Sequence, residues 1–257
     1  MISRAGICRG VPAASFRASR AMTNVLLALA GLALTVPVPA RAAEGARPSA
    51  SAPVQPANAE AASAEAANEA GESASMRVAD WIAASGDNGS LPYIIVDKKT
   101  ASLFLFDAKR KSLGEAPVLI GVAVGDDASP GIGRKSLAKI GPAEKTTPSG
   151  RFLAKYGLAA GRQKVLWVDY ATSVALHPIP KDVSKKERRR QRMLSPTADD
   201  NRITFGCINV PTAFYNKSVR PLFQRKGGYV YVLPDTKPLE AVFPGLRAQA
   251  FVNSVAP

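Results

Sequence analysis

After residue 90, many of the bulky apolar residues come in short runs of five to seven residues, bounded by glycine, proline or polar turn residues. Runs of this kind are typical of β-strands. They are Tyr93–Asp97, Leu103–Asp107, Val118–Val124, Val165–Tyr170, Ser173–His177 and Tyr229–Leu233. Helical spacing is found at Met76–Ser85 and Val210–Gln224, and Pro221 should kink the second helix or end it early. We therefore predict a mainly β domain with a helix packed on it.

The first 42 residues have the features of an export signal. A basic leader without acidic residues precedes the apolar run Val25–Val36, and Ala40-Arg41-Ala42 offers small residues where a signal peptidase cleaves. The run is shorter than the roughly 18 residues of a membrane span, although an uncleaved anchor is the alternative. Cleavage after Ala42 would remove five arginines and Cys8, and would lower the net charge from +14 to +9. We expect an exported protein of the periplasm or cell envelope, with no stable membrane span.

Residues 43–75 differ in composition from everything that follows them. They are nearly all Ala, Glu, Ser, Pro, Asn and Gly, with no aromatic residue. Such a segment buries too little apolar surface to offset its loss of conformational entropy, so we predict a disordered linker. After it we expect a short helix and turn at 76–90 and a folded domain at 91–235. In the C-terminal extension at 236–257, apolar residues suggest a closing helix.

Without the signal, the chain would hold one cysteine, Cys207, and one histidine, His177. Cys207 follows Gly206 and precedes the predicted helix by a few residues, and a helix N-terminus favours the nucleophilic thiolate. His177 ends a predicted strand, where an imidazole can be aimed at a thiol, and backbone N–H groups near Gly206 could hold an oxyanion. Either residue alone is more often structural than catalytic. One His and one Cys are too few ligands for the usual metal site, so we expect neither a metal nor a cofactor.

The segment around Cys207 resembles the active-site signature of the L,D-transpeptidases, the YkuD-type catalytic domains. That family shows an upstream His, then Ser/Thr-His-Gly-Cys, an apolar residue and Arg or Asn. The matching residues are His177, Thr204, Gly206, Cys207, Ile208 and Asn209. Leu91–Asp107, Thr147–Phe152 and Tyr229–Leu233 are similar to the family's opening hairpin, its Thr-Pro-x-Gly-x-Phe segment and its closing strand. The resemblance covers about Leu91 to Pro234 and implies an L,D-transpeptidase-like β-sandwich.

Three features depart from the family's pattern. Phe205 stands where the motif has its His, which affects substrate fit more than the nucleophile. The stretch between His177 and Cys207 is longer than usual and includes the basic run Lys181–Arg192, with seven basic and two acidic residues. Pro178 follows His177 where the family often has Gly or Ser, so we expect a backbone carbonyl to orient the imidazole.

The resemblance implies a cysteine acyltransferase that cross-links peptidoglycan stem peptides through a thioester on Cys207. His177 would be the base, and Gly206, Thr204, Phe205 and Asn209 would surround the oxyanion and the substrate. If water replaces the acceptor amine, the same site is an L,D-carboxypeptidase or amidase. A non-catalytic wall-binding module is the other alternative, and the sequence leaves all of these open.

The basic run Lys181–Arg192 has two interpretations. It is either a solvated helical face or a lid that attracts an anionic cell-wall polymer through its positive field. Nucleic acid is not an expected partner, because the chain carries an export signal and no aromatic residues interleave with the basic ones.

Overall fold

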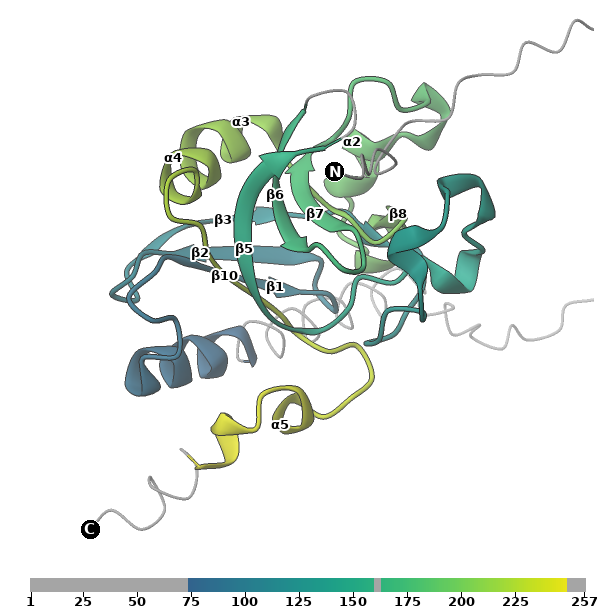
Figure 1. Ribbon diagram of the computed structural model, residues 1–257. Helices are drawn as coiled ribbons and strands as arrows, with labels where there is room; N and C mark the ends of the chain where they lie inside the picture. Colours follow the sequence, from purple (N-terminus) through teal and green to yellow (C-terminus); the bar gives the residue numbers. More distant parts are fainter. Residues whose placement is uncertain (1–73, 160–162, 249–257) are drawn as a thin grey trace, which may run out of the picture.

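The computed structural model describes residues 74–159 and 163–248, so the predicted signal and the linker up to residue 73 lie outside the described residues. Eight strands form one curved sheet in the order β3-β2-β1-β10-β5-β6-β7-β9, and β4 pairs with β8 (Figure 1). The strands are β1 Tyr93–Asp97, β2 Ser102–Phe106, β3 Ser112–Pro117, β4 Ile120–Gly121, β5 Gly150–Leu158, β6 Lys164–Asp169, β7 Val174–Pro178, β8 Arg202–Thr204, β9 Ile208–Val210 and β10 Gly228–Val232. The prediction of a mainly β fold with a packed helix is confirmed. No helix within the described residues is long and apolar enough to cross a membrane.

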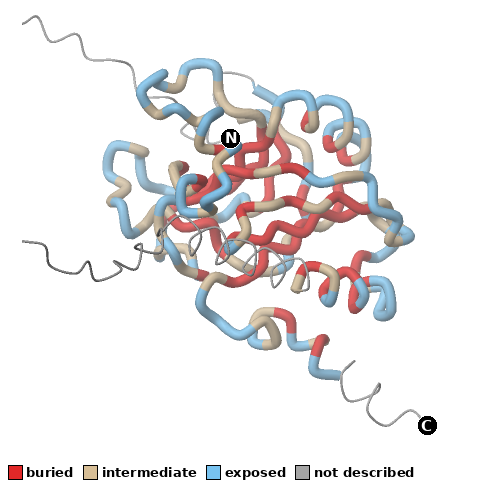
Figure 2. Tube along the Cα trace, turned by 180° about the vertical axis from the view of Figure 1, so that it is seen from behind, coloured by how far each residue is buried: buried red, intermediate tan, exposed pale blue. Residues whose placement is uncertain are grey.

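The neighbouring strands β1 and β10 are buried on both faces of the sheet. They pair in parallel, which is possible because a long stretch of chain connects them. Ile94 and Val230 point into the main core, whereas Tyr93 and Tyr231 point into a second cluster on the opposite face. Figure 2 shows the buried residues concentrated along the strands. Burial on both faces explains why these strands are continuous apolar runs without polar alternation.

A helical segment between β9 and β10 packs on the inner face of the sheet. It consists of α3 (Thr212–Phe214), a π-helical stretch at Tyr215–Val219 and α4 (Arg220–Phe223). Tyr215, Val219 and Phe223 are buried against the inward side chains of the strands. The segment does not end early at Pro221. The wider π turns before it fit a proline that lacks the N–H for the usual helical hydrogen bond.

The helix at 74–85 and the C-terminal extension pack together on the outer face of β1 and β10. Trp81 meets Tyr231 edge to face, with ring centroids 6.2 Å apart, and also contacts Phe243. The predicted closing helix is present as two short pieces, α5 (Leu239–Val242) and residues 245–248. Gly245 lets the Trp81 ring approach, because a Cβ there would lie 2.5 Å from the indole nitrogen.

Several strands differ from the sequence prediction. The predicted strand Val118–Val124 is mostly absent as a regular strand, since only Ile120–Gly121 forms β4. Leu119, just before it, pairs with Asn209 of β9 and thereby nearly closes the sheet. β3 and β5 were not among the predicted runs, because exposed or half-buried residues dominate both strands and leave no continuous apolar run.

Candidate active site

The parallel strands β7 and β9 bring His177 and Cys207 to one face of the sheet. Leu176 pairs with Ile208, and His177 pairs with Asn209. Leu176 and Ile208 point into the main core. Because side chains alternate along a strand, His177 and Asn209 point away from that core, and so does Cys207, which immediately precedes Ile208.

The register also fixes how far apart the two predicted residues lie. Continued by one residue, it puts Ala175 opposite Cys207 and two residues before His177. With strands about 4.8 Å apart and a rise of about 3.3 Å per residue, an ideal sheet of this register would place the Cα atoms of Cys207 and His177 roughly 8 Å apart. Cys207 is 6% exposed and belongs to a small cluster with Ala175 and Trp167.

The Cys207 side chain also contacts the beginning of β7. Its Sγ lies 3.8 Å from the backbone carbonyl oxygen of Ser173, a distance at which a thiol is a weak donor. His177 lies four residues further along the same chain.

The imidazole of His177 has one identified partner at each ring nitrogen. Nδ1 lies 2.7 Å from the carbonyl oxygen of Pro178, which can only accept, so Nδ1 carries the proton of the neutral ring. The expectation that a backbone carbonyl contacts the imidazole is thus confirmed. Nε2 lies 3.5 Å from Nδ2 of Asn209 on the neighbouring strand. A neutral ring with its lone pair at Nε2 is the form that can accept a thiol proton.

Thr204 organises the loop in front of the cysteine. Its Oγ1 donates to the carbonyl oxygen of Cys207 at 2.6 Å and accepts the Gly206 N–H at 3.1 Å. The Gly206 N–H, which the sequence suggested as an oxyanion donor, is therefore engaged within the loop. This hydrogen bond would have to break before that group could hold an oxyanion.

Thr147 holds the same loop from the other side. Its Oγ1 donates to the Gly206 carbonyl at 2.9 Å and accepts the Gly121 N–H at 2.9 Å. Gly206 has φ +119°, and a Cβ there would lie 2.7 Å from the Thr146 carbonyl oxygen, so both conformation and space require glycine. The sequence signal for Thr147 was its Thr-Pro-x-Gly-x-Phe context, which gave it no role in the site.

The structure corrects the predicted position of Cys207 relative to a helix. Strand β9 and Pro211 separate it from α3, which begins only at Thr212. The field of a helix end falls off within its first turn. The helix N-terminus therefore contributes little to the electrostatic field at the Cys207 thiol.

A buried ionic cluster contacts the Thr147 segment that holds the loop before Cys207. The Lys98 Nζ, whose side chain is 0% exposed, lies 3.1 Å from Asp126 and 3.3 Å from Asp235, and it donates to the Thr147 carbonyl at 3.0 Å. Arg202, the first residue of β8, pairs with Asp235 at 2.7 Å. The cluster thus ties the Thr147 segment and β8 to the segment that follows β10. Lys98 directly follows the apolar run Tyr93–Asp97, and no sequence motif pointed to its burial.

Phe205 takes up a contact that its sequence position did not suggest. The Lys145 Nζ lies 3.9 Å from the centroid of the Phe205 ring. A cation at this distance is attracted to the ring face. Within the described residues, no carboxylate pairs with Lys145. A positive charge without a paired acid therefore lies beside the loop that leads to Cys207.

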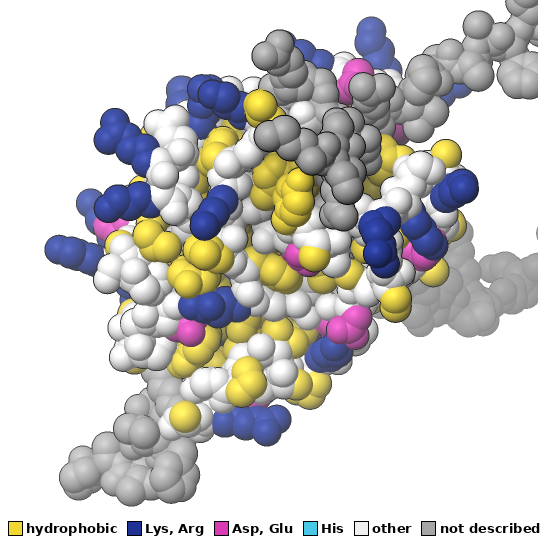
Figure 3. Space-filling model, viewed as in Figure 1, with side chains coloured by type: hydrophobic (Ala, Val, Ile, Leu, Met, Phe, Trp, Pro, Cys, Tyr) yellow, Lys and Arg dark blue, Asp and Glu magenta, His cyan; other side chains and the backbone are white. Residues whose placement is uncertain are grey.

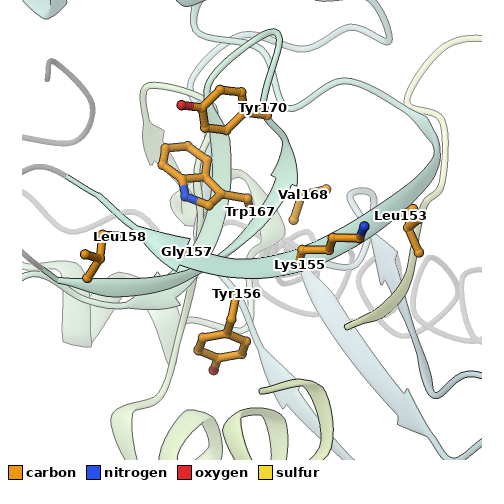
Figure 4. A pocket seen from close by; sticks show the side chains of 8 residues that line it. All are labelled: Leu153, Lys155, Tyr156, Gly157, Leu158, Trp167, Val168 and Tyr170. Atoms are coloured by element: carbon orange, nitrogen blue, oxygen red, sulfur yellow. The ribbon is translucent and has the colours of Figure 1, made fainter. Parts of the chain in front are cut away.

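A pocket of about 460 Å³ opens on β5 and β6 (Figure 4). Trp167 and Tyr170 lie on one side of β5 and meet edge to face with centroids 5.2 Å apart, whereas Tyr156 lies on the other side. Trp167 pairs with Lys155 on one neighbouring strand and with Ala175 on the other. The pocket therefore continues the row of side chains that ends at Cys207.

The basic run folds into a 3₁₀ turn at Lys185–Glu187 and the short helix α2 (Arg189–Met193). Most of its cations are exposed: Lys181, Lys185, Lys186, Arg188 and Arg190. On the face seen in Figure 3, Lys and Arg side chains are scattered without forming a single patch. Among the described residues, no group of three or more His, Cys, Asp or Glu side chains could hold a metal ion.

No protein-family model matches the sequence, and no curated protein matches it either. Similar solved structures include an L,D-transpeptidase from Xylanimonas cellulosilytica, with 12% identity, a TM-score of 0.33, and coverage of 55% of this chain and 60% of that one. The catalytic domain of the Enterococcus faecium L,D-transpeptidase has 15% identity and a TM-score of 0.29, covering 55% of this chain and 96% of that one. A mutant of a helical cell shape determining protein from Campylobacter jejuni has 11% identity and a TM-score of 0.38, covering 70% and 64%. The chain spans 60% and 64% of the length of the first and third of these structures.

Proposed function

We propose that the protein is an exported cysteine acyltransferase that cross-links peptidoglycan stem peptides, an L,D-transpeptidase. One observation carries the proposal. Cys207 and His177 share one face of neighbouring strands, and the His177 ring presents an unprotonated Nε2 towards the strand of Cys207. A thiol and a neutral imidazole on the same face of neighbouring strands are suited to act as a nucleophile and its base.

In the first half of the proposed reaction, His177 Nε2 takes the proton of the Cys207 thiol. The thiolate attacks the carbonyl carbon between an L-centre residue and the terminal D-residue of a stem peptide, and a C–S bond forms. When the tetrahedral intermediate collapses, the C–N bond breaks. The D-residue leaves as an amine that takes the proton from His177, and the stem remains as a thioester on Cys207.

In the second half, an amine from a neighbouring stem attacks the thioester carbon. Its proton passes to His177, a new C–N bond forms and the C–S bond breaks. The proton then returns to the departing sulfur, and the thiol is restored. If water is the acceptor, the same steps make a carboxypeptidase or amidase, so the acceptor decides between transferase and hydrolase.

Two features beside Cys207 support a peptide substrate that bears carboxylates. The pocket containing Trp167 and Tyr170 continues the row of side chains that reaches Cys207 and offers an apolar wall. Lys145 offers an ammonium without a carboxylate partner among the described residues. The exposed cations of Lys181–Arg192 add a positive field that would attract an anionic wall polymer.

A carbapenem tests the proposal directly, since an L,D-transpeptidase thiol is acylated by this class of β-lactam. We expect the intact mass of the protein to rise by one carbapenem, and Cys207→Ser to abolish the adduct. His177→Ala should slow acylation by at least about 100-fold, the contribution of one general base. If a small thiol reagent labels Cys207 and the carbapenem does not, the protein is a wall-binding module and the proposed chemistry is wrong.

A second assay separates the transferase from the hydrolase. The purified protein is incubated with a disaccharide-tetrapeptide, and the products are separated by mass. Cross-linked dimers would support the transferase, whereas shortened monomers alone would identify the carboxypeptidase or amidase. His177→Ala and Cys207→Ala serve as matched inactive variants, and both should leave the substrate unchanged.

Export is part of the proposal and has its own measurement. We propose that the signal is removed after Ala42 and that the protein works in the periplasm or cell envelope. The N-terminal residue of protein recovered from the envelope fraction should be Ala43. Recovery of a chain that still begins at Met1 would point to an uncleaved anchor.

A further inference from the structure

Arg189 behaves differently from the other cations of the basic insertion. Its side chain is 11% exposed, whereas its neighbours Arg188 and Arg190 are exposed. Its Nε donates to Glu187 at 2.7 Å, and its Nη1 donates to Oδ1 of Asn209 at 2.8 Å. One arginine of the insertion therefore reaches the strand that follows the candidate nucleophile.

The contact with Arg189 decides which way the Asn209 side-chain amide points. A guanidinium only donates hydrogen bonds, so the carbonyl oxygen of the amide must face Arg189. The Nδ2 of Asn209 is then left facing His177, and it lies 3.5 Å from the ring Nε2. Because Nδ2 is a donor, this side of His177 is complementary to a ring nitrogen that carries a lone pair.

We propose that Arg189 is a positioning residue that acts through Asn209 to keep the Nε2 of His177 unprotonated. The Pro178 carbonyl accepts from Nδ1 and favours the same tautomer from the other side of the ring. If Asn209 turned its amide over, its oxygen would face Nε2 and would favour a proton there. That form of the ring could not take a proton from Cys207 through Nε2.

The inference gives the long insertion a definite role in the site. Glu187 holds Arg189 through an ion pair, and both residues belong to the stretch that makes the segment between His177 and Cys207 unusually long. The next turn is also fixed, because the Nδ2 of Asn201 donates to the Val118 carbonyl at 2.7 Å. Through these contacts, two charged side chains are linked to His177, namely Arg189 and Glu187. Cys207 lies on the same face of the sheet as His177.

The chain contains one histidine, so the tautomer can be read without ambiguity. The experiment uses protein labelled with ¹⁵N at the imidazole, carrying no histidine tag, and records the two ring nitrogens by NMR across the pH range. We expect the neutral ring of the parent protein to carry its proton at Nδ1. Arg189→Ala should give a mixture of tautomers, and Arg189→Lys an intermediate mixture, because an ammonium cannot fork between Glu187 and Asn209.

Arg190→Ala is the matched control, since it removes the same charge from an exposed neighbour. The kinetic arm compares carbapenem acylation of these variants. For Arg189→Ala we expect a rate lower by about tenfold, the size of one hydrogen bond. Arg190→Ala should stay within about twofold of the parent rate, as a surface change. Thermal unfolding of each variant reports whether the fold is intact.

Only the kinetic arm rests on the proposed function. If the parent protein is not acylated, the proposed function fails, and the NMR arm still decides the role of Arg189. The inference is overturned if Arg189→Ala and Arg190→Ala show the same proton position on the neutral ring. It is supported if only Arg189→Ala and Arg189→Lys change it.

Discussion

The Thr147 hydroxyl donates a hydrogen bond to the Gly206 carbonyl at 2.9 Å and accepts one from the Gly121 N–H. One hydroxyl therefore joins β4 to the loop in front of Cys207. The Thr147 carbonyl in turn accepts from the buried Lys98. The loop is thereby held through a continuous set of hydrogen bonds that reaches the ionic cluster beneath it. This arrangement makes the geometry around Cys207 dependent on residues that do not touch the thiol.

Replacing this hydroxyl tests that dependence. Thr147→Val keeps the shape of the side chain and leaves the Gly121 N–H and the Gly206 carbonyl without this partner. We expect the free energy of unfolding to fall by about 1–3 kcal/mol and carbapenem acylation to slow. Thr212→Val, at an exposed threonine, is the control and should change neither quantity. Equal behaviour of the two variants in urea unfolding and acylation would contradict this role.

Gly206 is predicted to reject any side chain. Gly206→Ala would place a Cβ 2.7 Å from the Thr146 carbonyl oxygen on a backbone with φ +119°. We expect a loss of about 2–4 kcal/mol in unfolding free energy and little acylation. Gly86→Ala separates conformation from crowding, because Gly86 has φ +67° with nothing within 4 Å of the added atom. It should lose about 1 kcal/mol and keep its rate of acylation.

Lys98 neutralises two carboxylates in the interior. Lys98→Met leaves Asp126 without this cation and Asp235 with Arg202 alone. Removing one partner of a buried ion pair lowers the unfolding free energy by about 3–5 kcal/mol. Lys99→Met, at the exposed neighbouring lysine, should change the urea midpoint little. A similar midpoint for both variants would mean that the cluster does not stabilise the fold.

Asp126 makes stability sensitive to acid. Burial acts to raise the pKa of Asp126, but hydrogen bonds from the Lys237 N–H, the Thr236 side chain and the N–H groups of Asp235 and Thr236 outweigh it and hold the pKa well below its ordinary value. A carboxyl whose pKa is lowered by folding adds stability above its unfolded pKa of about 3.9, and this stability is lost as the pH falls through the folded value. Unfolding free energy should therefore decline below about pH 4.

The variant Asp126→Asn isolates that contribution, because it removes the titrating group. Its unfolding free energy should be lower at neutral pH and should depend less on pH in the acid range. Urea unfolding at a series of pH values measures both. An acid dependence identical to that of the parent protein would assign the effect to other carboxyls.

The exposed cations of the insertion should act through charge alone. Lys185→Gln combined with Lys186→Gln should weaken binding to isolated peptidoglycan sacculi at low salt, and the difference should vanish at high salt, where surface charges are screened. Lys109→Gln with Lys111→Gln, on the exposed turn before β3, is the charge-matched control. Co-sedimentation measures the bound fraction. Equal loss in both variants would point to net charge and would argue against a specific role of the insertion.

Much of the fold could be predicted from local patterns. The apolar runs at β1, β2, β6, β7 and β10 identified these strands to within one residue at each end. Buried strands consist mostly of apolar residues, and such runs can be recognised in the sequence. The predicted runs did not include β3, β5, β8 or β9, since exposed or half-buried residues dominate β3 and β5, and β8 and β9 are only three residues long. The helix after Cys207 was predicted to start at Val210, but Val210 pairs in β9, and strand pairing depends on a distant partner that local spacing does not reveal.

The sequence by itself determined which side chains could do chemistry. It identified a single cysteine and a single histidine downstream of the predicted signal, with Gly206 beside the thiol. Only the tertiary structure decided how they meet: the register of β7 against β9, the proton on Nδ1 of His177, the Thr204 contact that engages the Gly206 N–H, and the reach of Arg189 to Asn209. The physical reason is that strand pairing and the Arg189 contact join residues far apart in the chain. The local contacts at His177 and Gly206 depend on backbone conformations that this pairing and the burial of Lys98 impose, and no local pattern encodes these.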